Sequence, residues 1–259
     1  MNLTPLRRSY IDPLSIAYHR AGSGPSLLLL HGFGYSADTW REVIPDLAAH
    51  FEVVAVDLPG FGLSAEPAEP TPQGVSGRLL DGIQALGLRD LLAVGHSYGA
   101  HVALRLALAA PDRVRGVVAT SVTGIGPQAP WLRPEYVQVL RAHQETLSRS
   151  FGTLRGWINH DPASPVPRPI LQRNLSALGE ACFRPDQNLF DDLKRISTPT
   201  LFLWGQEDRQ ADVAWGEAAV REMPDARLRT WPACGHLAYV ERRRAWLQEV
   251  IVFGIEGFE

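Results

Sequence analysis

The sequence has little lysine, few cysteines and no long apolar run. Lys194 is the only lysine, so arginine carries almost all of the positive charge, and the formal net charge is −3. A chain without a basic surface lacks the main source of non-specific affinity for nucleic acid, so we expect no nucleic-acid partner. No stretch approaches the ~20 apolar residues that cross a membrane, and the first residues lack the apolar core of a secretory signal. We therefore expect a cytoplasmic protein with no membrane partner.

The small number of cysteines is also informative. Cys182 and Cys234 are the only two, and they do not show the spacing of a metal site. Two cysteines cannot build a disulfide framework, and nothing else in the sequence indicates an oxidising compartment. Both are therefore expected to be free thiols, and no metal site is predicted.

Short apolar runs alternate with helical patterns over most of the chain. The runs end at glycine, proline or a polar residue and cover residues 26–30, 52–56, 91–94, 114–120, 200–204 and 226–231. Between them, apolar side chains recur at helical spacing in residues 38–50, 76–86 and 98–110. This alternation predicts an α/β fold with a mostly parallel central sheet and helices on both faces. Residues 9–11 and 15–18 flank the turn signal Asp12-Pro13, which predicts an antiparallel hairpin at the sheet edge.

The strand signal disappears between residues 123 and 197. This stretch is rich in proline and carries the patterns of short helices. We expect a helical cap here, inserted between two parts of one core, residues 1–122 and 198–259. Three aromatic residues of the expected cap either line a pocket or only pack the cap helices together: Trp131, Tyr136 and Trp157.

The segment Gly95-His96-Ser97-Tyr98-Gly99 matches the G-x-S-x-G pattern of a nucleophile elbow. A buried strand is expected before it and an apolar helix after it, which is the context that the pattern requires. Side chains in place of the two glycines would collide with the neighbouring strand and helix. The strained turn lifts the serine hydroxyl out of the carboxyl end of the sheet. Ser97 is therefore the candidate nucleophile.

A serine hydroxyl is a poor nucleophile at neutral pH and needs a base that is itself held in orientation. In folds with this elbow, an acid and then a histidine follow the serine along the chain. Asp208 follows the expected strand 200–204, and His236 follows the expected strand 226–231. The other histidines precede the elbow, lie in or beside a motif, or fall in the expected cap. Glu207 is adjacent to Asp208 and is the alternative acid.

The elbow is one of five motifs that occur in a fixed order. The others are His31-Gly32-Phe33-Gly34, the stretch from Asp57 to Ser64, Trp204-Gly205-Gln206-Glu207-Asp208, and Gly235-His236. Together they resemble the α/β-hydrolase superfamily, in its serine esterase-like branch with a helical cap. The resemblance implies a catalytic triad of Ser97, Asp208 and His236 that acts through an acyl-enzyme, without a metal or an organic cofactor. It also implies that the backbone N–H groups of Phe33 and Tyr98 form the oxyanion hole.

The resemblance does not fix the substrate, because this superfamily performs diverse chemistry on one fold. A small carboxylic ester or lactone is the expected substrate, since it demands least beyond the triad. Carbon–carbon bond hydrolases, thioesterases, perhydrolases and prolyl aminopeptidases share the motifs, and a small-molecule receptor with little turnover is a further alternative. A hydroxynitrile lyase is disfavoured, because such enzymes of this superfamily rely on a pocket lysine and Lys194 is the only lysine. The sequence leaves the oligomeric state and the acyl chain length open.

Overall fold

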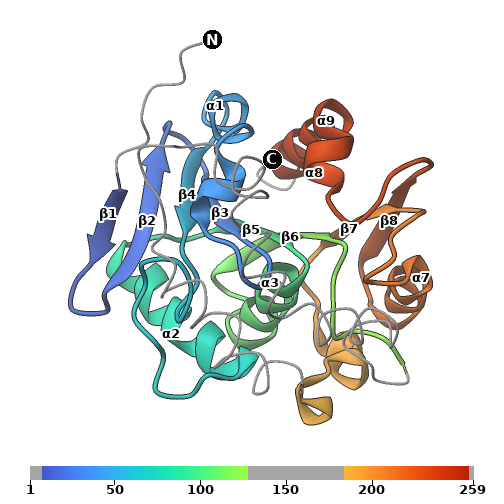
Figure 1. Cartoon of the computed structure of the whole chain (residues 1–259), viewed down its shortest axis with the longest axis horizontal. Helices are drawn as coiled ribbons and strands as arrows, with labels where there is room; N and C mark the ends of the chain where they lie inside the picture. The colour runs from blue at the N-terminus through green and yellow to red at the C-terminus, as the bar shows by residue number, and fades with distance from the viewer. Residues whose placement is uncertain (1–7, 128–183, 257–259) are drawn as a thin grey trace, which may run out of the picture.

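The computed structural model describes residues 8–127 and 184–256, which are built around an eight-stranded sheet (Figure 1). The strands are β1 (Arg8–Ile11), β2 (Ile16–Ala21), β3 (Ser26–Leu30), β4 (Glu52–Val56), β5 (Leu91–His96), β6 (Val114–Thr120), β7 (Thr200–Gly205) and β8 (Ala226–Trp231). They lie in the order β1-β2-β4-β3-β5-β6-β7-β8. The pairs β1–β2 and β2–β4 are antiparallel, and the other pairs are parallel. The predicted α/β fold with a mostly parallel sheet and an edge hairpin is confirmed.

Helices cover both faces of this sheet (Figure 1). On one face, a hydrophobic cluster joins the sheet to α2 (Pro72–Ala85), α3 (Tyr98–Ala109) and α7 (Val213–Glu222). On the other face, a second cluster contains residues of the 3-10 helix η1 (Ala37–Trp40), α1 (Ile44–Leu47), α8 (Ala238–Glu241) and α9 (Arg243–Glu256). Two further 3-10 helices, η2 (Pro185–Gln187) and η3 (Phe190–Arg195), precede β7.

Strand β3 shows how one strand contributes to both clusters. Leu28 and Leu30 belong to the cluster with α2 and α3, whereas Leu27 and Leu29 belong to the cluster with α9. Successive side chains of a strand point to opposite faces, so a strand that is covered on both faces has to be apolar throughout. The continuous apolar runs of the sequence are therefore the central strands of the sheet.

The single helix predicted for residues 38–50 is wrong, because the structure has η1 and the short α1 there instead. Pro45 stands in the first turn of α1. Since proline has no N–H group, a continuous helix would lack the hydrogen bond from residue 45 back to residue 41. The apolar pattern was still informative about burial, because Trp40, Val43 and Leu47 are all buried against the sheet.

Helix α2 begins at Pro72, four residues before the predicted start. The Thr71 hydroxyl accepts a hydrogen bond from the N–H of Gly74 at 3.1 Å and caps the helix. Threonine is a favoured N-cap residue and proline is favoured at the first helical position, so this start has a local physical cause. The apolar pattern alone does not show this start, because Thr71, Pro72 and Gly74 carry the signal.

Strands β6 and β7 are parallel neighbours in the sheet, and the predicted cap falls between them in the sequence. The cap and its bounds stay a prediction. The described residues on either side of residues 128–183 are joined by hydrogen bonds: the Leu189 N–H donates to the Gly124 carbonyl at 2.9 Å, and the Asn188 side chain donates to the Gly126 carbonyl at 3.1 Å. Trp131, Tyr136 and Trp157 lie outside the described residues, so their predicted place in a pocket stays a prediction. In the described ranges, no helix has both the length and the apolar character needed to cross a membrane.

Gly99, in the first turn of α3, is expected to tolerate no side chain. A Cβ atom there would overlap with the backbone carbonyl oxygens of Leu30 and His31, which belong to the central strand and its loop. Gly99→Ala should therefore lower the free energy of unfolding by about 3 kcal/mol or more, as overpacking against rigid backbone does. Urea unfolding followed by circular dichroism measures the change.

Gly77→Ala is the matched control, because Gly77 lies on the exposed side of α2 with no atom within 4 Å of the added Cβ. Replacing a helical glycine by alanine should raise the stability by up to about 1 kcal/mol. Equal stability of the two variants would contradict the packing described for the elbow.

Candidate active site

The order and parallel direction of the strands bring the three residues of the predicted triad to one edge of the sheet. Strand β5 ends directly before Ser97, whose N–H donates to the Thr120 carbonyl at the end of β6, at 2.8 Å. Asp208 and His236 follow the ends of β7 and β8. These four strands are parallel neighbours, so the loops after them meet at the same edge.

Ser97 occupies a strained turn between β5 and α3. Its backbone has φ 53° and ψ −117°, a region that residues with a side chain rarely adopt. The Ser97 carbonyl then accepts hydrogen bonds from the N–H groups of Ala100 and His101, so the helix begins at once. Gly95 and Gly99 make the close approach of strand and helix possible, since a Cβ at either position would overlap with backbone atoms. The local geometry is that of the predicted elbow.

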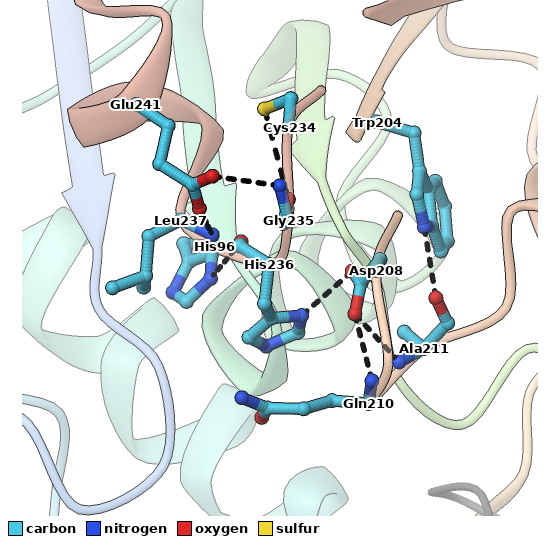
Figure 2. A network of polar contacts seen from close by, with 10 residues as sticks. All are labelled: His96, Trp204, Asp208, Gln210, Ala211, Cys234, Gly235, His236, Leu237 and Glu241. Atoms are coloured by element: carbon cyan, nitrogen blue, oxygen red, sulfur yellow. Dashed lines mark hydrogen bonds and ion pairs between the residues drawn. The ribbon is translucent and has the colours of Figure 1, made fainter. Parts of the chain in front are cut away.

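His236 and Asp208 form a buried hydrogen-bonded pair (Figure 2). The His236 Nδ1 atom lies 2.8 Å from Asp208 Oδ2. The other carboxylate oxygen, Oδ1, accepts from the N–H groups of Gln210 at 2.8 Å and Ala211 at 3.0 Å. A carboxylate can only accept, so Nδ1 is the protonated nitrogen and the neutral ring keeps a lone pair on Nε2. This is the tautomer that a general base needs.

The electrostatics keep Asp208 ionised. Burial alone favours the neutral carboxyl, but the electrostatic attraction and hydrogen bond of His236, with the backbone N–H groups of Ala211 and Gln210, outweigh it and lower the pKa of Asp208. Glu207, the alternative acid of the sequence analysis, is exposed, and its backbone N–H donates to the Cys234 carbonyl. The structure thus pairs His236 with Asp208 and not with Glu207.

Phe33 and Tyr98, the residues predicted to offer N–H groups to an oxyanion, are neighbours. Their rings meet edge to face with centroids 5.9 Å apart, and the Phe61 ring lies 5.3 Å from Phe33 and 5.7 Å from Tyr98. The loop after β3 is therefore packed against the start of α3, next to Ser97. Their role as oxyanion donors stays a prediction.

His31 and Asp57, which directly follow β3 and β4, hold neighbouring loops through their side chains. The imidazole of His31 accepts from the Leu58 N–H at 2.9 Å through Nε2 and donates to the Gly32 carbonyl through Nδ1. The Asp57 carboxylate accepts from the N–H groups of Ala37 at 2.7 Å and Leu63 at 2.8 Å. These bonds hold together the loops that surround the candidate site.

Two side chains at the site were not singled out in the sequence. In the sequence, His96 is only a neighbour of the nucleophile in the elbow motif, and Glu241 belongs to none of the five motifs. Both make hydrogen bonds to the backbone of the loop that carries His236 (Figure 2). Spacing along the sequence gives no signal for Glu241, because the contact depends on how α8 turns back on the loop. Among the described residues, no group of three or more His, Cys, Asp or Glu side chains is arranged to hold a metal ion.

Known families and solved structures that resemble this chain agree on one family. The family model described as the alpha/beta hydrolase family matches residues 27–249. The crystal structure of the esterase RhEst1 from Rhodococcus sp. ECU1013 superposes with a TM-score of 0.72 at 26% identity, over 97% of this chain and 98% of that one.

Several curated proteins are similar to most of this chain. A 2-hydroxy-6-oxo-6-phenylhexa-2,4-dienoate hydrolase from Burkholderia cepacia is 29% identical, over 92% of this chain and 90% of its own length. A pimeloyl-[acyl-carrier protein] methyl ester esterase from Nitrosomonas europaea is 28% identical, over 87% of this chain and 94% of its own length. The dihydrolipoyllysine-residue acetyltransferase component of an acetoin cleaving system from Cupriavidus necator is 29% identical over 90% of this chain, which spans only 64% of that protein.

Proposed function

Because the chain belongs to the alpha/beta hydrolase family, we propose that it is a serine hydrolase that cleaves a small carboxylic ester or lactone. The observation that carries the proposal is the buried pair of His236 and Asp208 at the sheet edge where the strained turn presents Ser97. A hydrogen-bonded acid and base beside a serine in such a turn is the arrangement needed for nucleophilic attack on an acyl carbon.

The mechanism follows from the tautomer of His236. Its unprotonated Nε2 removes the proton of the Ser97 hydroxyl as the oxygen attacks the acyl carbonyl, and Asp208 stabilises the imidazolium that forms. The backbone N–H groups of Phe33 and Tyr98 hold the oxyanion of the tetrahedral intermediate. The imidazolium gives its proton to the leaving alkoxide, and an acyl-enzyme remains. Water then releases the acid by the same steps, without a metal or an organic cofactor.

Similarity to known hydrolases supports the ester as the first substrate class to test. The Nitrosomonas europaea relative is described as a methyl ester esterase and the Rhodococcus structure as an esterase. The Burkholderia cepacia relative, described as a hydrolase of 2-hydroxy-6-oxo-6-phenylhexa-2,4-dienoate, favours carbon–carbon bond hydrolysis as the second candidate. Both reactions can use the same three side chains, so the triad alone does not separate them.

A substrate series tests the proposal. The purified protein is assayed with p-nitrophenyl esters from acetyl to dodecanoyl and, in parallel, with 2-hydroxy-6-oxo-6-phenylhexa-2,4-dienoate. Turnover of the esters with a clear optimum in chain length is the expected result. Turnover of the dienone acid with negligible ester hydrolysis would replace the ester proposal with the second candidate. No turnover of either substrate would contradict both.

A further inference from the structure

The loop that carries His236 is fixed by hydrogen bonds to its backbone on both sides of the histidine (Figure 2). The Gly235 N–H donates to Glu241 Oε2 at 2.8 Å, and the Leu237 N–H donates to Glu241 Oε1 at 3.2 Å. Between them, the His236 carbonyl accepts from His96 Nε2 at 3.0 Å. Consecutive backbone groups are thus held by two side chains from other parts of the chain.

His96 connects this loop to the nucleophile. It is the last residue of β5 and directly precedes Ser97. The residue is 1% exposed, and its ring lies against the His236 ring, with centroids 4.7 Å apart, and against the Tyr239 ring at 5.0 Å. The hydrogen bond to the His236 carbonyl therefore joins the residue before the nucleophile directly to the backbone of the base.

The protonation state of His96 is determined by its surroundings. A carbonyl oxygen only accepts, so Nε2 has to carry a proton. The other nitrogen, Nδ1, is buried and has no hydrogen-bond partner among residues 8–127 and 184–256; it lies beside Gly32, where an added Cβ would be 2.9 Å from it. Burial, followed by repulsion from His236, lowers the pKa of His96 well below the usual value for histidine. His96 is therefore a neutral donor with a fixed tautomer, unsuited to act as a second base.

Glu241 holds the same loop from the solvent side. It is the last residue of α8, and its side chain is exposed, so it is not part of the hydrophobic core. Both of its carboxylate oxygens accept from the loop, one on each side of His236. An exposed carboxylate with two backbone donors leaves the peptide units around His236 little freedom to rotate.

We propose that His96 and Glu241 are positioning residues that hold the His236 backbone, with the His96 bond fixing the base relative to Ser97. This inference rests on the proposed function, in which His236 is the general base. The imidazole must reach Asp208 and Ser97 together, and a displacement of about 1 Å at a reacting group can cost about 100-fold in rate. Both residues act through the backbone around His236, so we expect their loss to affect the chemical step and to leave substrate binding unchanged.

The experiment compares two substitutions of His96. His96→Leu removes the donor at similar volume, whereas His96→Gln can return an N–H donor close to the position of Nε2. We expect His96→Leu to lower kcat about 10- to 100-fold with KM within about twofold, and His96→Gln to recover most of the loss. The measurement is steady-state hydrolysis of the best p-nitrophenyl ester, corrected for active enzyme by titration with a fluorophosphonate.

A spectroscopic readout makes the test independent of turnover. The proton between His236 Nδ1 and Asp208 gives a low-field resonance in the proton NMR spectrum of the free enzyme. This resonance should broaden or disappear in His96→Leu and return in His96→Gln. If the wild type hydrolyses no ester, the proposed function fails, while this resonance still decides the positioning role.

A substitution of the exposed Glu241 is a second test of the proposal, and it remains available if His96→Leu does not fold. Glu241→Gln replaces one acceptor by a donor that faces a backbone N–H, and we expect it to lower kcat about 3- to 10-fold at constant KM. Glu249→Gln is its matched control, because Glu249 of α9 pairs with Arg229 of β8 and not with the backbone of the His236 loop. Wild-type kcat and an unchanged resonance in both His96→Leu and Glu241→Gln would overturn the proposal. The proposal would also be overturned if kcat of His96→Gln were no higher than kcat of His96→Leu. The volume of the side chain, and not its N–H donor, would then determine the rate.

Discussion

Ser97→Ala is expected to lower kcat for ester hydrolysis by about 10⁵-fold or more, the scale seen when a serine nucleophile is removed from a triad. Every step of the proposed mechanism passes through a covalent bond to the Ser97 oxygen, so no partial function is expected. The fold should persist, because alanine and serine share the same restriction at the positive φ of 53°. Steady-state kinetics on the best ester and a thermal melting curve measure the two effects.

Ser121→Ala is the matched control for this variant. Ser121 is also buried, directly follows the neighbouring strand β6 at the same sheet edge and has a φ of 49°. It has no part in the proposed mechanism, so its loss should leave kcat within about threefold of the wild type. Comparable activity of Ser97→Ala and Ser121→Ala would exclude Ser97 as the nucleophile.

The second large effect is expected for Asp208→Asn, which should lower kcat by about 10⁴-fold. The N–H groups of Gln210 and Ala211 both point at Oδ1, so the asparagine will place its carbonyl oxygen there and its NH₂ group toward His236. A donor at that position forces His236 Nδ1 to accept, which moves the ring proton to Nε2. The imidazole then faces the serine with the wrong tautomer and cannot act as a base.

Asp212→Asn is the control for a neighbouring aspartate. Asp212 caps α7, where its carboxylate accepts from the Ala214 N–H at 3.1 Å, and asparagine is an equally good N-cap. Its kcat should stay within about twofold of the wild type. If Asp208→Asn lowered kcat by less than tenfold, the account of the His236 tautomer would be contradicted, even with Ser97 confirmed as the nucleophile.

Local patterns explain why much of this molecule could be predicted from its sequence. The central strands carry apolar residues on both faces, so the runs ending at Leu30, Val56 and Thr120 were found with their observed ends. The order of serine, acid and histidine along the chain likewise allowed Ser97, Asp208 and His236 to be predicted, and the structure places all three at one sheet edge. The first signal is contained in a few consecutive residues, and the second is the order of three residue types along the chain.

Features that depend on contacts between distant segments could not be predicted in this way. The packing of η1 and α1 against the same face of the sheet as α9 is one such feature. His96 lies 140 residues from His236, whose carbonyl it binds. The role of Glu241 depends on the turn between β8 and α8, for which its own sequence neighbourhood gives no pattern.

Labelling with a fluorophosphonate, followed by peptide mass spectrometry, tests the central claim most directly. The reagent phosphonylates a serine only where a base and an oxyanion hole activate it, and it needs no knowledge of the natural substrate. The account predicts one adduct per chain, located on Ser97, with labelling suppressed in Asp208→Asn. An unlabelled wild-type protein, or an adduct on any serine other than Ser97, would contradict it.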